Sequence, residues 1–216
     1  FSGKVDFDPG AGENILCANS GWDMFISKLD SNGGFIWALS FPLVSGGWVQ
    51  KILVDSNSGD IIVTGSYTET VDMDPGPNTF NLISKGSFDI FVAKYTNAGN
   101  FIWAKSIGGT SYDGTSSLAV DDAHNLYLTG RFNNTCDFDP GNGIYNLTSN
   151  GLSDIFICKL NSSGEFTWAK QVGGSNNDGA NDISIDHVNG ESIVLTGGFS
   201  GTCDFDPGPA VFNFTS

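Results

Sequence analysis

The chain has 216 residues and a formal net charge of −15, because 24 Asp and Glu outnumber 9 Lys and Arg. A surface this negative repels nucleic acids and anionic membranes, so we expect neither as a partner, and no apolar run is long enough to cross a bilayer. The 29 glycines and the short apolar runs between polar clusters predict strands joined by tight turns.

The sequence Asp-x-Asp-Pro-Gly occurs four times and divides the chain into repeats. Its copies begin at Asp6, Asp72, Asp137 and Asp204, which are 66, 65 and 67 residues apart. Units that recur in this way bury their apolar faces against their neighbours. We therefore expect a single repeat domain, 1–216. Its repeats lie at approximately 6–71, 72–136 and 137–203, and 204–216 starts a fourth.

Four strands can be followed in one period of the repeat. Residues 89–95 and 101–107 flank a Gly-containing turn, and residues 116–121 and 125–132 flank a second short turn. Four short antiparallel strands per repeat, stacked face to face, are typical of a propeller blade. The predicted fold class is all-β: a β-propeller-like repeat array of four-stranded antiparallel blades.

This strand order leaves the array open at both ends. If 116–121 and 125–132 are inner strands, the chain starts with an outer half-blade, 23–40, and ends with an inner half-blade, 181–199. About three blades' worth is too little for a ring, which needs roughly four to eight. The tail of one copy could pair with the head of the next, giving a six-bladed ring or a filament. The alternative is a piece cut from a longer array.

The recurring strings also carry a family resemblance. Asp-Ile-Phe-Val-Ala-Lys, Phe-Ile-Trp-Ala-Lys, Leu-Ala-Val-Asp, Tyr-Leu-Thr-Gly and Asp-Phe-Asp-Pro-Gly resemble the SBBP-type β-propeller repeats of secreted and cell-surface bacterial proteins, over essentially the whole chain. The resemblance implies a propeller scaffold at the bacterial cell surface or outside the cell, and it implies no particular activity. The first repeat departs from the pattern, since Trp48 stands where the others have Asp113 and Asp178.

The repeat motifs contain eight aspartates that are candidate metal ligands. Residues i and i+2 of an extended segment point to one side, so the two carboxylates of each motif repel unless a cation or hydrogen-bond donors neutralise them. Ca²⁺ is the cation that such oxygen ligands favour. The competing interpretation is a turn former that needs no metal. The candidates are Asp6, Asp8, Asp72, Asp74, Asp137, Asp139, Asp204 and Asp206.

The four cysteines are candidates for two disulfides. If each repeat is counted from the residue before its motif, Cys136 and Cys158 share one repeat, whereas Cys17 and Cys203 share one only if the tail of one copy joins the head of another. An even number per repeat suits an oxidising compartment. The alternative is that Cys158, at the repeat position of Ser27, is a small buried thiol.

Glycans could be attached to the chain or bound by it. Tryptophans at one repeat position either fill space between blades or stack on sugars, and Trp22 and Trp48, which break the repeat, are candidates to face a partner. The repeated tryptophans are Trp37, Trp103 and Trp168. N-glycosylation sequons occur at Asn133, Asn146, Asn161 and Asn213.

No catalytic signature was found in the sequence. His124 and His187 lie in predicted turns without a nucleophile at a recognisable spacing, and no metalloprotease or phosphate-loop motif occurs. The predicted function is a non-catalytic extracellular structural or adhesive repeat protein that assembles with itself head to tail. The alternative is a carbohydrate- or protein-binding propeller segment of a larger surface protein.

Overall fold

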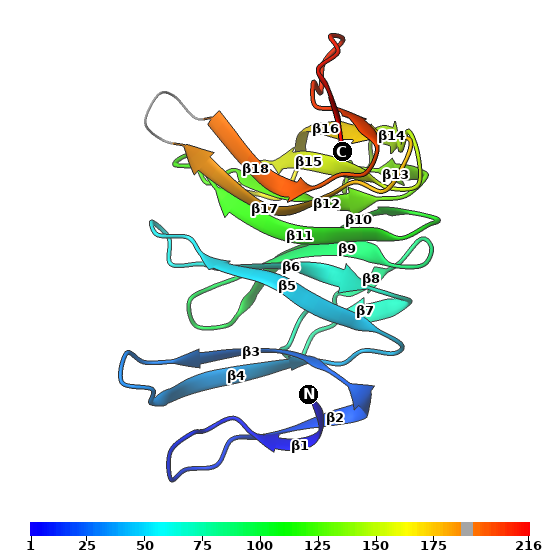
Figure 1. The fold of residues 1–216 in the computed structure, drawn as a ribbon. Helices are drawn as coiled ribbons and strands as arrows, with labels where there is room; N and C mark the ends of the chain where they lie inside the picture. The colour runs from blue at the N-terminus through cyan, green and yellow to red at the C-terminus, as the bar shows by residue number, and fades with distance from the viewer. Residues whose placement is uncertain (187–191) are drawn as a thin grey trace.

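The computed structural model describes residues 1–186 and 192–216, and within them every named strand pairs antiparallel with its neighbours (Figure 1). The described residues contain twenty strands and no helix. The chain is therefore all-β, and its sheets follow one another as a propeller-like stack of blades, as the sequence predicts. No helix in this described part of the chain is long and apolar enough to cross a membrane.

Two blades are complete, and both follow the predicted strand order from the inner to the outer edge. Blade 1 consists of β5 (Gly47–Val54), β6 (Ile61–Tyr67), β9 (Asp89–Tyr95) and β10 (Phe101–Gly109). Blade 2 consists of β11 (Asp113–Val120), β12 (Leu126–Phe132), β15 (Asp154–Leu160) and β16 (Phe166–Gly174). The middle strands are almost wholly buried, which explains why their sequences are nearly continuous apolar runs.

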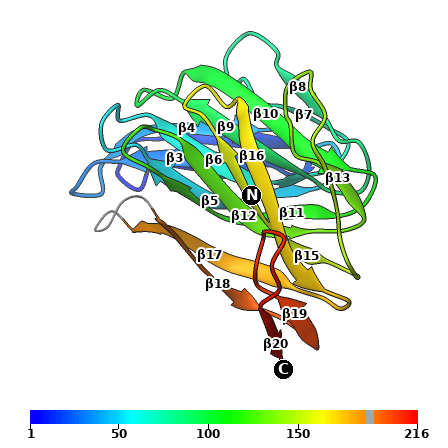
Figure 2. The same cartoon turned by 90° about the horizontal axis from the view of Figure 1, so that it is seen from above.

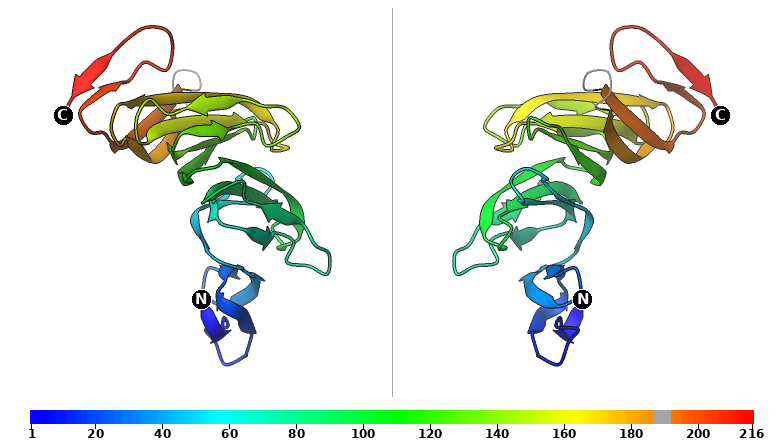
Figure 3. Two further views of the ribbon diagram at one scale, coloured as in Figure 1. Left: turned by 90° about the vertical axis from the view of Figure 1, so that its right-hand side faces the viewer. Right: turned by 90° about the vertical axis from the view of Figure 1, so that its left-hand side faces the viewer.

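Half-blades lie at the two ends of the stack. β3 (Met24–Leu29) and β4 (Phe35–Phe41) have the repeat positions of the outer strands β9 and β10. β17 (Gly179–Asp186) and β18 (Ser192–Gly198) have those of the inner strands β11 and β12. The two half-blades lie at opposite ends of the molecule and do not pair with each other (Figures 1 and 3). The predicted open array is thus confirmed.

Each Asp-x-Asp-Pro-Gly motif lies in a hairpin between the second and third strand positions of a blade. The four hairpins are β1 (Ser2–Asp6) with β2 (Ile15–Trp22), β7 (Thr70–Asp72) with β8 (Asn81–Ile83), β13 (Thr135–Asp137) with β14 (Asn146–Thr148), and β19 (Thr202–Asp204) with β20 (Asn213–Thr215).

These hairpins join successive blades. β13 follows β12 of blade 2 but pairs with β10 of blade 1, where Gly109 lies opposite Cys136. β19 extends β16 in the same way (Figure 2), with Gly174 opposite Cys203. A Cβ at Gly109 would lie 2.1 Å from the Thr135 carbonyl oxygen, so only glycine admits this close approach. The hairpins of blade 2 and of the C-terminal half-blade therefore pair with the outer strand of the blade before them, whereas β7 of blade 1 makes an isolated bridge of Val71 to Leu43, which follows β4.

Apolar clusters fill the spaces between successive blades. The N-terminal half-blade contributes Ile26 to the first cluster and blade 1 contributes Phe91. The second cluster joins Val92 of blade 1 to Phe156 of blade 2. The third joins Ile157 of blade 2 to β17 and β18. The half-buried tryptophans of the repeat each pack against one cluster, so they fill space between blades as expected; they are Trp37, Trp103 and Trp168.

One sequence alignment between repeats was wrong by a residue. Gly47 lies opposite Tyr67 as Asp113 lies opposite Phe132, so Gly47, and not Trp48, takes the aspartate position. The Trp48 ring instead packs on Phe88, with ring centroids 4.8 Å apart. The joint between the N-terminal half-blade and blade 1 consequently lacks a carboxylate that the other two joints have.

Replacing Phe138, at the tip of a joining hairpin, should destabilise the stack strongly. Its side chain is fully buried, with ring centroids 5.3 Å from Phe132 and 5.1 Å from Phe156. We expect Phe138→Ala to lower the free energy of unfolding by about 3–5 kcal/mol, measured by urea denaturation. Phe212→Ala, at a 59% exposed position, is the control and should cost about 1 kcal/mol or less. Equal losses in the two variants would contradict this packing role of Phe138.

Candidate functional site

Apolar side chains gather on the outward faces of both half-blades. The N-terminal face is defined here by the exposed Trp22, Phe25 and Leu29, together with Ile52 and Val54 on β5 of blade 1, which the half-blade leaves uncovered. The C-terminal face is defined by the exposed Val194 and Phe214, and by Leu195, Phe199 and Phe205, which are partly buried against blade 2. Exposed apolar patches of this kind are typical of interaction surfaces. The two faces are the candidate functional site of the described chain.

The same repeat positions are buried inside the stack. Phe25 is 46% exposed, whereas its equivalents Phe91 and Phe156 are 1% and 0% exposed. Ile52 lies opposite Val63 as Leu118 lies opposite Leu128, yet Ile52 is 50% exposed and Leu118 only 1%. The terminal faces thus carry residues suited to a blade interior.

Each face is also hollowed. Beside β18 a largely apolar hollow of ≈ 200 Å³ lies between blade 2 and the C-terminal half-blade, lined among others by Ile157, Leu195 and Phe205. A hollow of ≈ 390 Å³ on the N-terminal face is lined by Trp22, Phe25 and their neighbours. Trp22 is 71% exposed, as expected for a residue that faces a partner.

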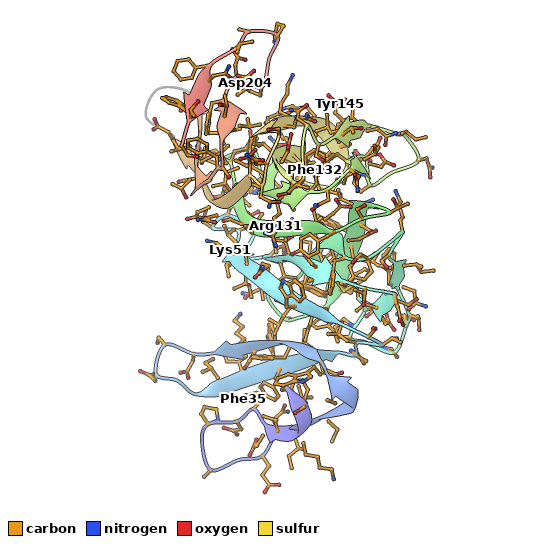
Figure 4. All side chains as sticks on the ribbon, turned by 45° about the vertical axis from the view of Figure 1, so that its right-hand side comes forward. Phe35, Lys51, Arg131, Phe132, Tyr145 and Asp204 are labelled. Atoms are coloured by element: carbon orange, nitrogen blue, oxygen red, sulfur yellow. The ribbon has the colours of Figure 1, made fainter. Side chains whose placement is uncertain are left out.

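Charged and polar side chains of one repeat position meet along the innermost strands. Lys51 on β5, Ser117 on β11 and Asp182 on β17 lie opposite Thr64, Thr129 and Thr196, respectively. Ser117 Oγ donates to Asp182 Oδ1 at 2.5 Å, and Lys51 Nζ lies 3.6 Å from the same oxygen. Figure 4 labels Lys51 on the cyan ribbon of blade 1. The inner edges of three successive blades therefore converge.

Buried carboxyl groups occupy the joint between blades 1 and 2. Asp89 and Asp113 are fully buried, and Asp113 Oδ2 accepts a hydrogen bond of 2.7 Å from Gly109 N. Burial raises the pKa of Asp89 to about 6, and burial together with the charge of Asp89 raises the pKa of Asp113 to about 6. Burial and these two carboxyl groups also raise the pKa of the Cys136 thiol.

The next joint repeats this arrangement. Asp154 and Asp178 are buried beside Cys203, and Asp178 Oδ2 accepts from Gly174 N at 2.7 Å. Burial raises the pKa of Asp154. One oxygen of Asp89 and one of Asp154 have no hydrogen-bond partner among the described atoms. The recurrence of Asp at these positions was visible in the sequence, but its burial was not.

The aspartates predicted as metal ligands are spread over four separate hairpins. In each motif the first carboxylate accepts two backbone N–H groups, as Asp137 Oδ1 does from Asp139 and Tyr145, and the second accepts one, as Asp139 does from Gly141. The other copies repeat these contacts. Carboxylates that accept backbone N–H groups of their own turn are what the interpretation of the motif as a turn former predicts. Within the described residues no group of three or more His, Cys, Asp or Glu converges on one point.

The pKa values of these first carboxylates follow from the same contacts. Hydrogen bonds from backbone N–H groups lower the pKa of Asp6 and of Asp204. For Asp137 partial burial acts to raise the pKa, but the bonds from Tyr145 and Asp139 and the charge of Lys85, whose Nζ is 3.3 Å away, lower it overall. Backbone N–H groups, joined at Asp137 by the Lys85 ammonium group, therefore stabilise the charged form of these carboxylates.

All four cysteines are free thiols in the structure, so the predicted disulfides receive no support from it. Cys136 and Cys158 are fully buried in one apolar cluster, which agrees with the alternative that Cys158 is a small buried thiol. Cys17 is exposed. Cys17 and Cys203 belong to hairpins at opposite ends of the stack (Figure 1).

The predicted glycosylation sites differ in their surroundings. Asn146 and Asn213 are exposed on hairpin strands. The Asn133 side-chain amide donates to Leu152 O at 2.7 Å, and that of Asn161 donates to Glu165 Oε2 at 2.8 Å. Glycosylation stays a prediction, and Asn146 and Asn213 are the more accessible positions.

Of the two histidines of the predicted turns, His124 lies within the described residues. His124 Nδ1 lies 2.6 Å from Asp55 Oδ2, which links the inner turns of blades 1 and 2. His187 lies outside the described residues.

Several residues of the candidate site were missed at the sequence level. The recurring Thr-Gly pair is the clearest: Thr64 and Thr129 each donate from Oγ1, at 2.7 Å, to a carbonyl on the neighbouring third strand. A Cβ at Gly65 would lie 2.0 Å from the Trp48 carbonyl oxygen, so a side chain is excluded there. Thr196 and Gly197 repeat the pair on β18, and this recurrence could have identified them.

Comparison with known proteins supports the β-propeller repeat type. The chain is 28% identical over 206 residues to an uncharacterised WD repeat-containing protein of Acanthamoeba polyphaga mimivirus, covering 87% of this chain and 15% of that protein. It is 26% identical over 116 residues to the regulatory protein FlaEY of Caulobacter vibrioides, covering 54% of this chain and 12% of that protein. No family model matches. The SBBP type therefore stays a prediction.

Calcium dependence can be tested together with the turn contacts. Asp137→Ala removes the acceptor of two backbone hydrogen bonds, so we expect a loss of about 1–3 kcal/mol in the free energy of unfolding. If the carboxylates act on the backbone alone, this loss is the same with excess EDTA and with millimolar CaCl₂, and the parent protein melts at one temperature in both. A rise in the melting temperature with CaCl₂ that Asp137→Ala reduces would instead demonstrate a metal site.

The buried carboxyl pair predicts that stability rises as the pH falls from 7 to 5. Since the folded pKa of Asp89 and Asp113, about 6, lies above the unfolded value, the folded state binds more protons in this range. Each unit of pKa shift corresponds to about 1.4 kcal/mol. Urea denaturation at pH 5, 6 and 7 should show a shallower slope for Asp113→Asn, and an unchanged slope for the exposed control Glu13→Gln. A slope that Asp113→Asn leaves intact would refute the assignment.

Proposed function

We propose that the chain is a non-catalytic structural or adhesive repeat protein of the bacterial surface or the extracellular space, and that matching half-blades complete its two ends head to tail. The observation that carries the proposal is the contrast in exposure between equivalent residues, such as Phe25 at 46% and Phe156 at 0%. Burying the apolar surface of such a residue lowers the free energy, and a neighbour that completes the blade would bury it as it is buried in the complete blades. Self-association then produces a ring or a filament according to whether the rotation closes.

Three features favour a scaffold over an enzyme or a ligand-binding module. The hollows lie at the ends of the stack, where a further half-blade would fit. The repeated tryptophans pack against blade cores and are not presented to solvent as a sugar-stacking platform. The buried carboxyl groups lie inside the joints, where they have no access to a substrate. These features support a role carried by assembly.

The matching half-blade can come from a second copy or from further repeats of the same polypeptide. The chain spans 15% or less of the length of the two relatives it matches. A longer protein of this kind could supply its own neighbouring half-blades. The extracellular location rests on the resemblance and on the acidic, Asn- and Gly-rich composition, and it stays a proposal.

Self-association is tested by measuring mass in solution. For the chain of 22.8 kDa, light scattering after size exclusion at micromolar concentrations and above should give two copies or more, with a strand-rich far-UV spectrum. A strictly single-chain mass at every concentration, with the same spectrum, would contradict assembly between copies. The double variant Val194→Lys, Ile52→Lys should remain folded and lose the association, because both side chains are at least half exposed and the new charges would be buried at the junction.

A further inference from the structure

We propose that a second copy completes the C-terminal half-blade in one defined strand register. In this assembly the C-terminal hairpin of one copy replaces the N-terminal hairpin of the next. This inference rests on the proposed self-association and specifies its geometry. The template is the chain itself, because the junction between a second inner strand and a third strand occurs twice, as β6–β9 and β12–β15. β18 carries the first half of that junction and β3 the second half.

The register follows from the two internal copies. Val63 lies opposite Ala93 in blade 1, and Leu128 lies opposite Cys158 in blade 2. The same repeat positions on the terminal strands place Leu195 of one copy opposite Ser27 of the next. The neighbouring pair is then Val194 opposite Lys28. Because side chains alternate between faces, a slip by one residue would turn the apolar set of β18 away from the core.

The Thr-Gly pair of β18 has the sequence that binds a third strand in the complete blades. Thr64 and Thr129 are fully buried and donate to the carbonyls of Phe91 and Phe156. Thr196 has the same position on β18 but is exposed. In the proposed register its hydroxyl meets the carbonyl of Phe25 in the second copy.

The hollow beside β18 has the position that a phenylalanine fills elsewhere in the stack. In the second cluster Phe156 of blade 2 packs against Val92 of blade 1. By the same relation, Phe25 of a second copy would pack against Ile157 and fill the ≈ 200 Å³ hollow. The exposure of Phe25 at one end of the stack and the hollow at the other end are thus both explained by this contact between copies.

Charge complementarity favours a second copy as the occupant. Asp182 accepts a hydrogen bond from Ser117, its positional equivalent on the adjacent blade. In the head-to-tail assembly the next blade after the completed one is blade 1 of the second copy, which has Lys51 at this position. Asp182, whose Oδ1 already lies 3.6 Å from Lys51 Nζ of its own chain, would then have a second ammonium group beside it, from the partner.

Two hairpins, the C-terminal one of the first copy and the N-terminal one of the second copy, would occupy the same position in this assembly. Residues 199–216 and 1–18 have equivalent repeat positions, so β19–β20 of one copy and β1–β2 of the next cannot both pack there. Phe1 at present pairs with Asp23 through two backbone hydrogen bonds of 2.8 and 2.9 Å. Phe7 packs on Phe25 with centroids 4.9 Å apart.

The C-terminal hairpin is the better anchored of the two. It extends β16 through a backbone ladder and buries Cys203 completely. Its rings Phe199 and Phe205 already lie 5.2 Å apart, the same separation as Phe1 and Phe7. The geometry therefore indicates that β1–β2 is the hairpin displaced on assembly and that β19–β20 takes its place. Phe205 of one copy then replaces Phe7 against Phe25 of the next copy.

Disulfide crosslinking tests the register. Two differently tagged chains, each with Cys17→Ser and one new cysteine, are mixed and oxidised. The remaining native thiols are fully buried. The in-register mixtures Leu195→Cys with Ser27→Cys and Val194→Cys with Lys28→Cys should form mixed dimers in at least about 5-fold higher yield than the slipped mixtures Leu195→Cys with Lys28→Cys and Val194→Cys with Ser27→Cys. Cysteine is compatible with position 27, because Cys158 has that position in blade 2.

The outcomes separate this inference from the function on which it rests. Higher yields from the slipped mixtures, in a protein that still associates, would overturn the register alone. Absence of every mixed dimer, with a single-chain mass, would overturn the self-association as well. For the exchange, Phe7→Ala should strengthen dimerisation several-fold and Phe205→Ala should weaken it several-fold. Weakening by both variants would overturn the exchange.

Discussion

The backbone ladder between the second and third strands of each blade is the interaction on which the rest of the structure depends. It joins the inner hairpin of a blade to its outer hairpin, in the same register in blades 1 and 2. Without it, each hairpin retains an edge of unpaired N–H and C=O groups and an apolar face without a neighbour. The chain shows hairpins with this ladder, in blades 1 and 2, and hairpins without it, in the two half-blades.

The Asp-x-Asp-Pro-Gly hairpins add a second connection, between blades instead of within them. Each motif uses its carboxylates to hold a tight turn, and in blade 2 and the C-terminal half-blade a short strand of the hairpin pairs with the outer strand of the preceding blade. Glycines at the crossing permit the close approach, and buried carboxyl groups accept the backbone N–H groups there. The stack is therefore continuous through its hairpins as well as through its cores.

Much of this architecture could be predicted from periodicity. The recurring strings placed the strands of blades 1 and 2 and both half-blades, because each repeat buries the same positions. The hairpin attachment could not be predicted, since Gly109 and Cys136 belong to one sequence repeat but their pairing joins two different blades. The shift between Gly47 and Trp48 was missed because the first repeat has a divergent loop. The contrast between Phe25 and Phe156 required the exposure of each side chain, which only the structure provides.

Hydrogen–deuterium exchange at increasing protein concentration tests the central claim most directly. The account predicts that amides of residues 193–198 and 24–29 become protected as concentration rises, while those of 61–67 and 126–132, already paired inside complete blades, stay equally protected throughout. Exchange in the two terminal segments that remains fast and independent of concentration over the whole range would contradict it.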